Sequence, residues 1–207
     1  MAVSLRRARP EPLANSPAAF HAPLFHDLVT SLDENQRHIV LDLGSASTEM
    51  LALLGRSPSR VEIVDLAYFG GIDRLNAPAT RSERASVADA ILPHPLPGEK
   101  FDLVFCWDLP NYLTLDALAA LMNAIARRTR PGALAHALVV YAEREMGDGP
   151  GRYVPTADAE LIDRSTHRAS IEAPRYSPAD LGDSMGGFVL DRARLLGNGM
   201  QEFLFRL

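Results

Sequence analysis

Gly44 and Asp65 are the residues whose types and spacing most clearly suggest chemistry. Gly44 ends the apolar run 39–43, small residues follow it, and a run with helical spacing begins near Thr48. A strand, a tight turn and a helix open nucleotide-binding α/β domains, where the free N–H groups of the helix start can face an anionic group. Asp65 stands 21 residues after Gly44, near the spacing at which an acid meets a ribose. The pair predicts a nucleotide-like ligand, although a single glycine makes a weak motif.

Composition limits the class of protein and its partners. The 207 residues are 47% hydrophobic and 23% charged, which suits one α/β domain of ordinary globular character. A net charge of −5 gives no electrostatic reason to expect a nucleic-acid partner. The single cysteine, Cys106, cannot form an internal disulfide and suits a reducing compartment. Since no apolar stretch has the length of a membrane span or of a signal peptide core, we expect a cytoplasmic protein without membrane contact.

The remaining patterns predict the elements that would position Gly44 and Asp65. Residues 1–22 are expected to form a flexible arm and residues 23–207 a single domain. Residues 142–175 form a polar insertion with little periodicity. Apolar periodicity and turn residues predict helices over 23–32 and 114–130, and strands over 39–43, 60–65, 85–90, 101–107, 133–141, 188–193 and 201–207. The expected fold is α/β, with a seven-stranded, mostly parallel Rossmann-like sheet, helices on both faces and an antiparallel C-terminal hairpin.

The order of these motifs resembles the class I S-adenosylmethionine-dependent methyltransferases, from about Leu24 to the C-terminus. A hairpin at residues 187–205 resembles the end of that family's sheet. The motifs that carry the resemblance are Ile-Val-Leu-Asp-Leu-Gly (39–44), Val-Glu-Ile-Val-Asp (61–65), Ala-Asp-Ala-Ile-Leu-Pro (88–93), Phe-Asp-Leu-Val (101–104) and Arg-Pro-Gly-Ala (130–133). The resemblance implies S-adenosylmethionine as cofactor and S-adenosylhomocysteine as product.

The resemblance also implies a role for particular residues. Gly44 would let the backbone approach the methionine portion of the cofactor, and Asp65 would accept both ribose hydroxyls. Asp89 would accept the adenine amino group, while the backbone of Ala90 would donate to the ring. Leu66 would pack on the adenine face. The other residues expected to bind the cofactor are Asp42, Ser45, Ala46 and Trp107.

Methyl transfer from an activated sulfonium needs orientation more than covalent help, so the acceptor side would need only a base or a polar clamp. Asp108 and Tyr112 follow the strand expected over 101–107 and are the catalytic candidates; His94 and His167 are weaker ones. The acceptor is expected to be a small molecule, with a protein partner or a homodimer as further options. The histidines show no metal-ligand spacing with Cys or Asp, so no metal is predicted.

Two departures from the family pattern keep a second function open. The family has three alternating glycines, whereas this chain has Gly44, Ala46 and Thr48, and Glu49 puts a negative charge near the expected cofactor carboxylate. The alternative is therefore a catalytically silent methyltransferase-like protein that acts as a binding or assembly partner. A nicotinamide-dependent dehydrogenase is a more remote option, against which the C-terminal hairpin speaks.

Overall fold

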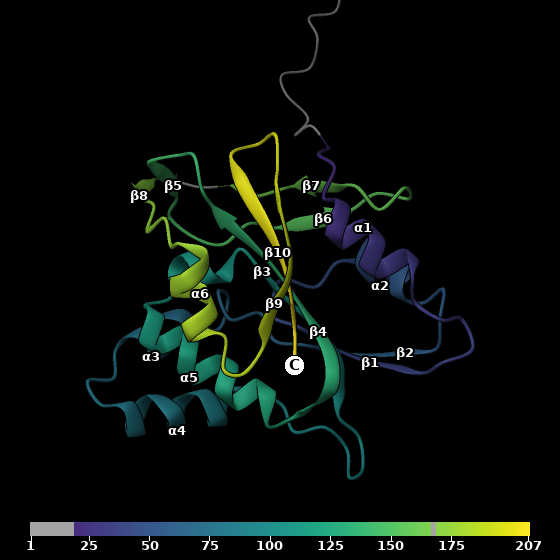
Figure 1. Cartoon of the computed structure of the whole chain (residues 1–207), viewed down its shortest axis with the longest axis horizontal. Coiled ribbons are helices and arrows are strands. Elements are labelled where there is room, and N and C mark those ends of the chain that lie inside the picture. The colour runs from purple at the N-terminus through teal and green to yellow at the C-terminus, as the bar shows by residue number, and fades with distance from the viewer. Residues whose placement is uncertain (1–18, 167–168) are drawn as a thin grey trace, which may run out of the picture.

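A six-stranded sheet forms the centre of the fold in the computed structural model, which describes residues 19–166 and 169–207 (Figure 1). Its strands are β1 (His38–Asp42), β2 (Ser59–Ile63), β3 (Phe101–Trp107), β4 (Thr129–Val140), β9 (Val189–Leu195) and β10 (Met200–Arg206). They lie in the order β2-β1-β3-β4-β10-β9. The first four strands are parallel, and β10 runs antiparallel to both of its neighbours. The mostly parallel α/β sheet and its antiparallel C-terminal hairpin are thus confirmed.

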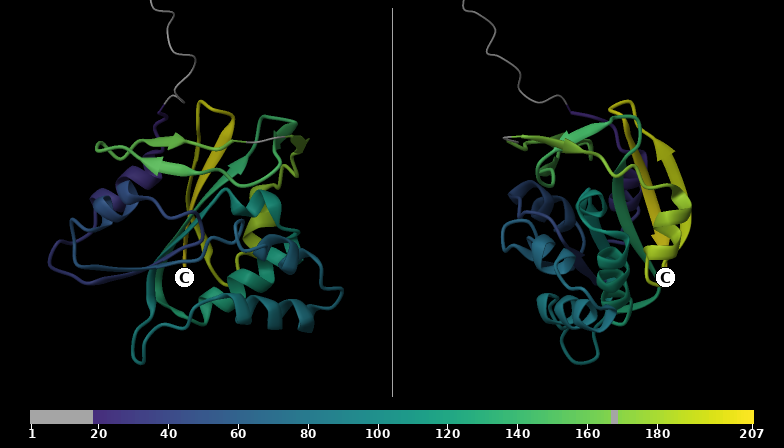
Figure 2. Two further views of the ribbon diagram at one scale, coloured as in Figure 1. Left: turned by 180° about the vertical axis from the view of Figure 1, so that it is seen from behind. Right: turned by 90° about the vertical axis from the view of Figure 1, so that its left-hand side faces the viewer.

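Helices cover both faces of this sheet, as predicted (Figures 1 and 2). Successive residues of a strand point to opposite faces, so Val40 packs in one hydrophobic cluster and Leu41 in the other. One cluster contains apolar residues of α1 and α2, and the other contains residues of α3 to α6. The helices are α1 (Pro23–Thr30), α2 (Thr48–Leu54), α3 (Gly71–Asn76), α4 (Arg81–Ile91), α5 (Leu115–Ala126) and α6 (Pro178–Ser184). Within the described part of the chain, no helix combines the length and apolar character needed to cross a membrane.

The prediction of a third strand over residues 85–90 is wrong, because these residues lie inside α4. A capping box starts this helix: the Thr80 hydroxyl accepts from the Glu83 N–H, and the Glu83 carboxylate accepts from the Thr80 N–H. Arg84 and Ala88, one turn apart, are its buried residues. The window 85–90 was too short to reveal this helical period. The sheet therefore has six strands rather than seven, and β2 is one of its edges.

The insertion at 142–175 forms two short antiparallel pairs in its described part. They are β5 (Glu145–Gly147) with β8 (Ser170–Glu172), and β6 (Tyr153–Pro155) with β7 (Leu161–Asp163). Both pairs lie across the end of the sheet toward which β4 points (Figure 1). Of the arm expected over residues 1–22, residues 1–18 lie outside the described residues, and Phe20 forms an isolated bridge with Leu161.

A buried carboxylate joins the N-terminal helix to the sheet. Glu202 of β10 is fully buried and accepts hydrogen bonds from the N–H groups of Leu24 (2.9 Å) and Phe25 (2.7 Å) at the start of α1. His136 Nε2 of β4 lies 2.8 Å from the same carboxylate. Burial by itself would raise the pKa of Glu202, but these contacts outweigh it and hold the pKa below its usual value. The ionised carboxylate thus supplies the acceptors that the first turn of α1 needs.

We expect Glu202→Gln to lower the free energy of unfolding by at least about 2 kcal/mol, because a neutral amide cannot accept both N–H bonds and leaves a buried donor unpaired. Urea denaturation of the variant and the wild type measures this difference. Glu34→Gln, in an exposed loop, is the matched control and should change stability by less than about 0.5 kcal/mol. Equal stability of the two variants would show that α1 is held by apolar packing alone.

Candidate functional site

A small cavity lies where β1, β2 and β3 end. The residues that shape it include Gly44 after β1, Asp65 after β2, and Trp107 and Asp108 at the end of β3. Because β2 and β3 flank β1 on opposite sides, this is a topological switch point of the sheet, where open α/β sheets bind ligands. The cavity measures only about 20 Å³, close to the space of one water molecule.

The side chain of Trp107 fills most of this place. Its indole Nε1 donates a 2.6 Å hydrogen bond to Asp42 Oδ1, and its ring stacks with Phe105 (5.5 Å between centroids) and Tyr153 (5.7 Å). A Cβ at Gly44 would lie 2.5 Å from the indole Cδ1. Gly44 therefore makes room for Trp107 in this structure, at the position where the family resemblance predicts room for a cofactor. Trp107 has φ of +50°, a strained conformation for a bulky residue.

Asp108 joins the end of β3 to the insertion. Its carboxylate accepts hydrogen bonds from the Gly151 N–H (2.9 and 3.1 Å) and from the Tyr153 hydroxyl (3.2 Å). Burial raises the pKa of Asp108 to about 7, even though these donors favour the charged form. Burial likewise raises the pKa of Asp42 to about 6, against the hydrogen bonds from Trp107 and the Gly44 N–H. Two of the predicted site residues are thus buried acids that titrate close to neutral pH.

The structure also brings Asp65 and Ser45 together at this edge. Asp65 Oδ2 accepts from the Ser45 hydroxyl at 2.7 Å, and Oδ1 accepts from the Tyr68 N–H at 2.9 Å. Both carboxylate oxygens that the resemblance reserves for a ribose therefore have partners within the chain. Ala46 is exposed and is not among the described residues with positive φ, so the missing glycine at this position causes no backbone strain.

Three predicted cofactor residues, Leu66, Asp89 and Ala90, do not line this cavity. Leu66 is 1% exposed and packs in the hydrophobic cluster under α3, against Gly71. Asp89 and Ala90 lie on α4, toward the opposite end of the sheet from the two short strand pairs (Figures 1 and 2). The prediction that they meet an adenine rested on a strand that is in fact a helix.

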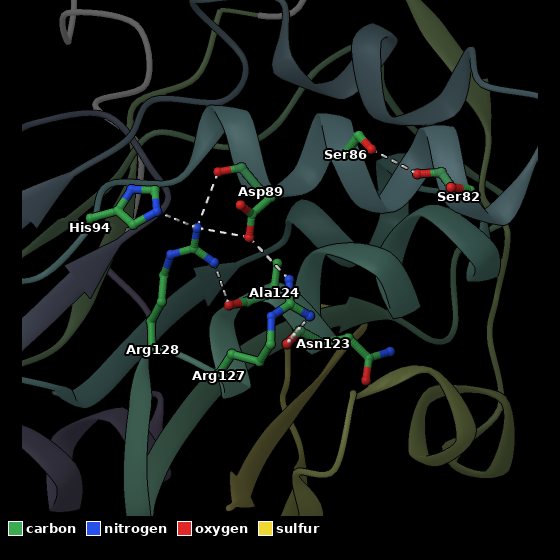
Figure 3. A network of polar contacts seen from close by, with 8 residues as sticks. All are labelled: Ser82, Ser86, Asp89, His94, Asn123, Ala124, Arg127 and Arg128. Carbon is green, nitrogen blue, oxygen red and sulfur yellow. Dashed lines mark hydrogen bonds and ion pairs between the residues drawn. The ribbon is translucent and has the colours of Figure 1, made fainter.

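Asp89 instead anchors α4 to the end of α5. Its carboxylate accepts from Arg127 (3.1 Å) and from Arg128 (2.9 Å), as Figure 3 shows. Arg128 also lies 3.2 Å from His94 Nε2 and donates to the Ala124 carbonyl at 2.8 Å. The hydrogen bonds from Arg127 and Arg128 hold the pKa of Asp89 below its usual value. Asp89 and His94, both proposed for chemistry from the sequence, therefore belong to one structural network.

The other acceptor-side candidates differ in their surroundings. The Tyr112 hydroxyl donates to the Gly147 carbonyl at 3.2 Å, and burial raises the pKa of Tyr112, so the hydroxyl stays protonated at neutral pH. His167 lies outside the described residues. Within those residues, no group of three His, Cys, Asp or Glu side chains could hold a metal ion.

Gly151 and Tyr153 are site residues that the sequence reasoning missed. They come from the insertion, whose lack of period hid the contact with Asp108. Next to the small cavity, an open cleft of about 490 Å³ separates residues 45–49 from Arg152 and Arg164. Arg164 Nη1 pairs with Glu49 Oε1 at 3.1 Å. Ser45 is the one residue that lines both the cleft and the cavity.

The residues at the switch point do not leave room for S-adenosylmethionine in the conformation described. Pockets that hold ligands of this size measure roughly 300–1,000 Å³, whereas the cavity beside Trp107 measures about 20 Å³. The indole occupies the space next to Gly44 and Asp42, and Asp65 is engaged by Ser45. Binding at this place would require Trp107 to move.

Comparison with known proteins identifies the fold of this chain. No protein-family model and no curated protein matches the sequence. The glycopeptide N-methyltransferase MtfA, complexed with S-adenosyl-L-homocysteine, is similar over 92% of both chains, with a TM-score of 0.50 and 12% identity. A S-adenosylmethionine-dependent methyltransferase from Clostridium acetobutylicum ATCC 824 has a TM-score of 0.49 and 13% identity, over 89% of this chain and 96% of its own. Burkholderia thailandensis 1,6-didemethyltoxoflavin-N1-methyltransferase has a TM-score of 0.45 and 17% identity, over 88% of this chain and 74% of its own. The chain has the class I methyltransferase fold, and identities this low show the fold alone.

The raised pKa values of Asp108 and Asp42 predict an unusual pH dependence of stability. An acid whose pKa is higher in the folded state binds an extra proton there, so its contribution is complete below the unfolded pKa and is lost as the pH rises through the folded value. We therefore expect the free energy of unfolding to increase as the pH falls from about 8 to about 5.5, by about 2 kcal/mol from Asp108. Urea denaturation across this range measures it.

Asp108→Asn isolates this contribution from that of the histidines and of Asp42. The variant should show a flatter dependence than the wild type over the same range, because the amide does not titrate. If the two curves run parallel, Asp108 is ionised in the folded protein throughout the range.

Proposed function

We propose that the cavity at the switch point is the closed form of an S-adenosylmethionine site, and that the chain is a methyltransferase acting on a small-molecule acceptor. The observation that carries this proposal is the convergence of Gly44, Asp65 and Asp108 where β1 lies between β2 and β3. Ligands of open α/β sheets bind at such a point. The class I methyltransferase fold supports the choice of cofactor, since MtfA of the same fold is complexed with S-adenosyl-L-homocysteine.

In the open form, Asp65 is the residue suited to two ribose hydroxyls, because a carboxylate offers two acceptor oxygens. Withdrawal of Gly151 and Tyr153 would expose Asp108. Because exposure relieves the burial that raises its pKa, the carboxylate would be ionised and able to accept a proton at neutral pH. Tyr112, with its raised pKa, would act as a hydrogen-bond donor to the acceptor rather than as a base.

Opening has a cost that lowers the apparent affinity. Displacing the indole of Trp107 gives up a hydrogen bond to Asp42 and the stacking with Phe105 and Tyr153, together roughly 3 kcal/mol. A closed state favoured by that amount weakens the apparent affinity for a ligand of the open state by about 150-fold. The cofactor would bind weakly unless an acceptor or partner also favours the open form.

The second candidate is a catalytically silent methyltransferase-like protein that acts by binding a partner. The observation that favours it is the closed site, in which Asp42, Asp65 and Asp108 all have hydrogen-bond partners from the chain itself. A site filled in this way forms part of the hydrophobic core and needs no ligand for its stability.

Calorimetric titration with S-adenosylhomocysteine separates the two candidates. For a methyltransferase, we expect Trp107→Ala to bind it roughly tenfold to a hundredfold more tightly than the wild type, because the variant no longer has to displace the indole. Adding Asp65→Ala to this variant should weaken binding roughly tenfold or more, through loss of the charge-assisted hydrogen bonds to the ribose.

Asp89→Ala is the matched control, since it removes an acid that the sequence suggested for the adenine but that lies on α4. It should leave the affinity unchanged in the Trp107→Ala background. Circular dichroism establishes that each variant is folded, and Tyr153→Ala serves as a second opening variant. Absence of binding heat in the wild type and in both folded opening variants would favour the silent protein.

A further inference from the structure

A third hollow, separate from the cavity and the cleft near the switch point, lies between α4 and α5. This groove measures about 450 Å³, and none of its lining residues takes part in the cavity at the switch point. Its lining combines small apolar side chains with charged ones. The alanines are Ala79, Ala85, Ala119 and Ala120, and the cations are Arg81, Arg84 and Arg127.

Arg84 is a buried residue of this groove, and contacts within the protein fix its side chain. Its side chain is held in place by a 2.6 Å hydrogen bond from Nη2 to the Pro78 carbonyl, and the residue is only 9% exposed. Its Nε is buried and has no hydrogen-bond partner. The carboxylate of Asp116 lies 3.4 Å from Nη1, and the Asp116 side chain is 81% exposed. A nearly buried guanidinium whose acidic partner is exposed and lies at 3.4 Å is suited to a competing anion.

The charge of the lining favours the same class of ligand. Three arginines face a single acid, Asp116, in the groove. Arg81 is exposed in the first turn of α4, and Arg127 is tied to Asp89 at the far end of the groove. Guanidinium groups bind carboxylate and phosphate through paired N–H donors, and the alanines of the lining suit a compact apolar group.

We propose that the α4–α5 groove binds a small organic anion, with one carboxylate or phosphate held by Arg84 and Arg81 and a compact apolar body against the alanines of the lining. The volume is within the range of small-molecule sites, roughly 300–1,000 Å³. The groove lies beside residues 85–90, which were predicted to form a strand and instead belong to α4. The proposal does not depend on cofactor binding at the switch point.

Ligand-observed NMR titrations of the full chain test this site with three probes: phenyl phosphate, benzoate and neutral benzyl alcohol. We expect saturable binding of at least one of the two anions and none of benzyl alcohol. The preferred anion then distinguishes a phosphate from a carboxylate site. Arg81→Gln should weaken this binding roughly tenfold, because it removes a charge-assisted hydrogen bond, and Ala85→Trp should abolish it by filling the groove.

Both variants change exposed residues, so they should fold even if Arg84→Gln does not. Arg74→Gln, on the exposed side of α3, is the matched control and should leave the affinity unchanged. The proposal is overturned if neither anion binds saturably, or if Arg74→Gln weakens binding as much as Arg81→Gln does. Either result would mean that the arginines of the groove serve only to attract anions diffusely.

Discussion

The contact of the Trp107 indole with Gly44 is the constraint around which the sheet edge is organised. Through this one ring, β3 is joined to Asp42 by a hydrogen bond and to Tyr153 of the insertion by stacking. A side chain at residue 44 would overlap the indole, so the glycine is needed whether or not a ligand ever binds. The indole of Trp107 therefore occupies the place next to Gly44 where the fold would otherwise hold a ligand. Whether a ligand can bind there depends on how readily the indole moves out.

Much of the fold could be predicted because its signals are local. The apolar run before Gly44 and the helical spacing over 114–130 can each be recognised within a single element. The structure has β1 and α5 at these two places. The exception, residues 85–90, shows the limit: the capping box of Thr80 and Glu83 lies outside that window and decides for a helix. A short alanine-containing segment with one valine has no strong preference, so the residues that flank it determine its structure.

The sequence allowed the acidic residues of the candidate site to be predicted, but not the residues that contact them. Asp42, Asp65 and Asp108 each end an apolar run, which brings them to one edge in any parallel sheet. Gly151 and Tyr153 reach Asp108 across 43 and 45 positions of the chain, from a segment whose composition shows no period. Such contacts depend on how a loop folds over the sheet, and one sequence contains no local signal for them.

Because residues 85–90 lie in α4 rather than in a strand, the sheet has an open edge that bears on association between copies of this protein. It leaves one side of β2 without a neighbouring strand among the described residues, and open strand edges invite intermolecular pairing and aggregation. Here the edge carries charge: Arg60 pairs with Glu62 on the strand and with Glu99, which also pairs with Arg37 at 2.8 Å. A second chain that added a strand to this edge would have to desolvate this ion-pair network. Charged side chains on an edge strand disfavour such pairing, so this network opposes the addition of a further strand to β2.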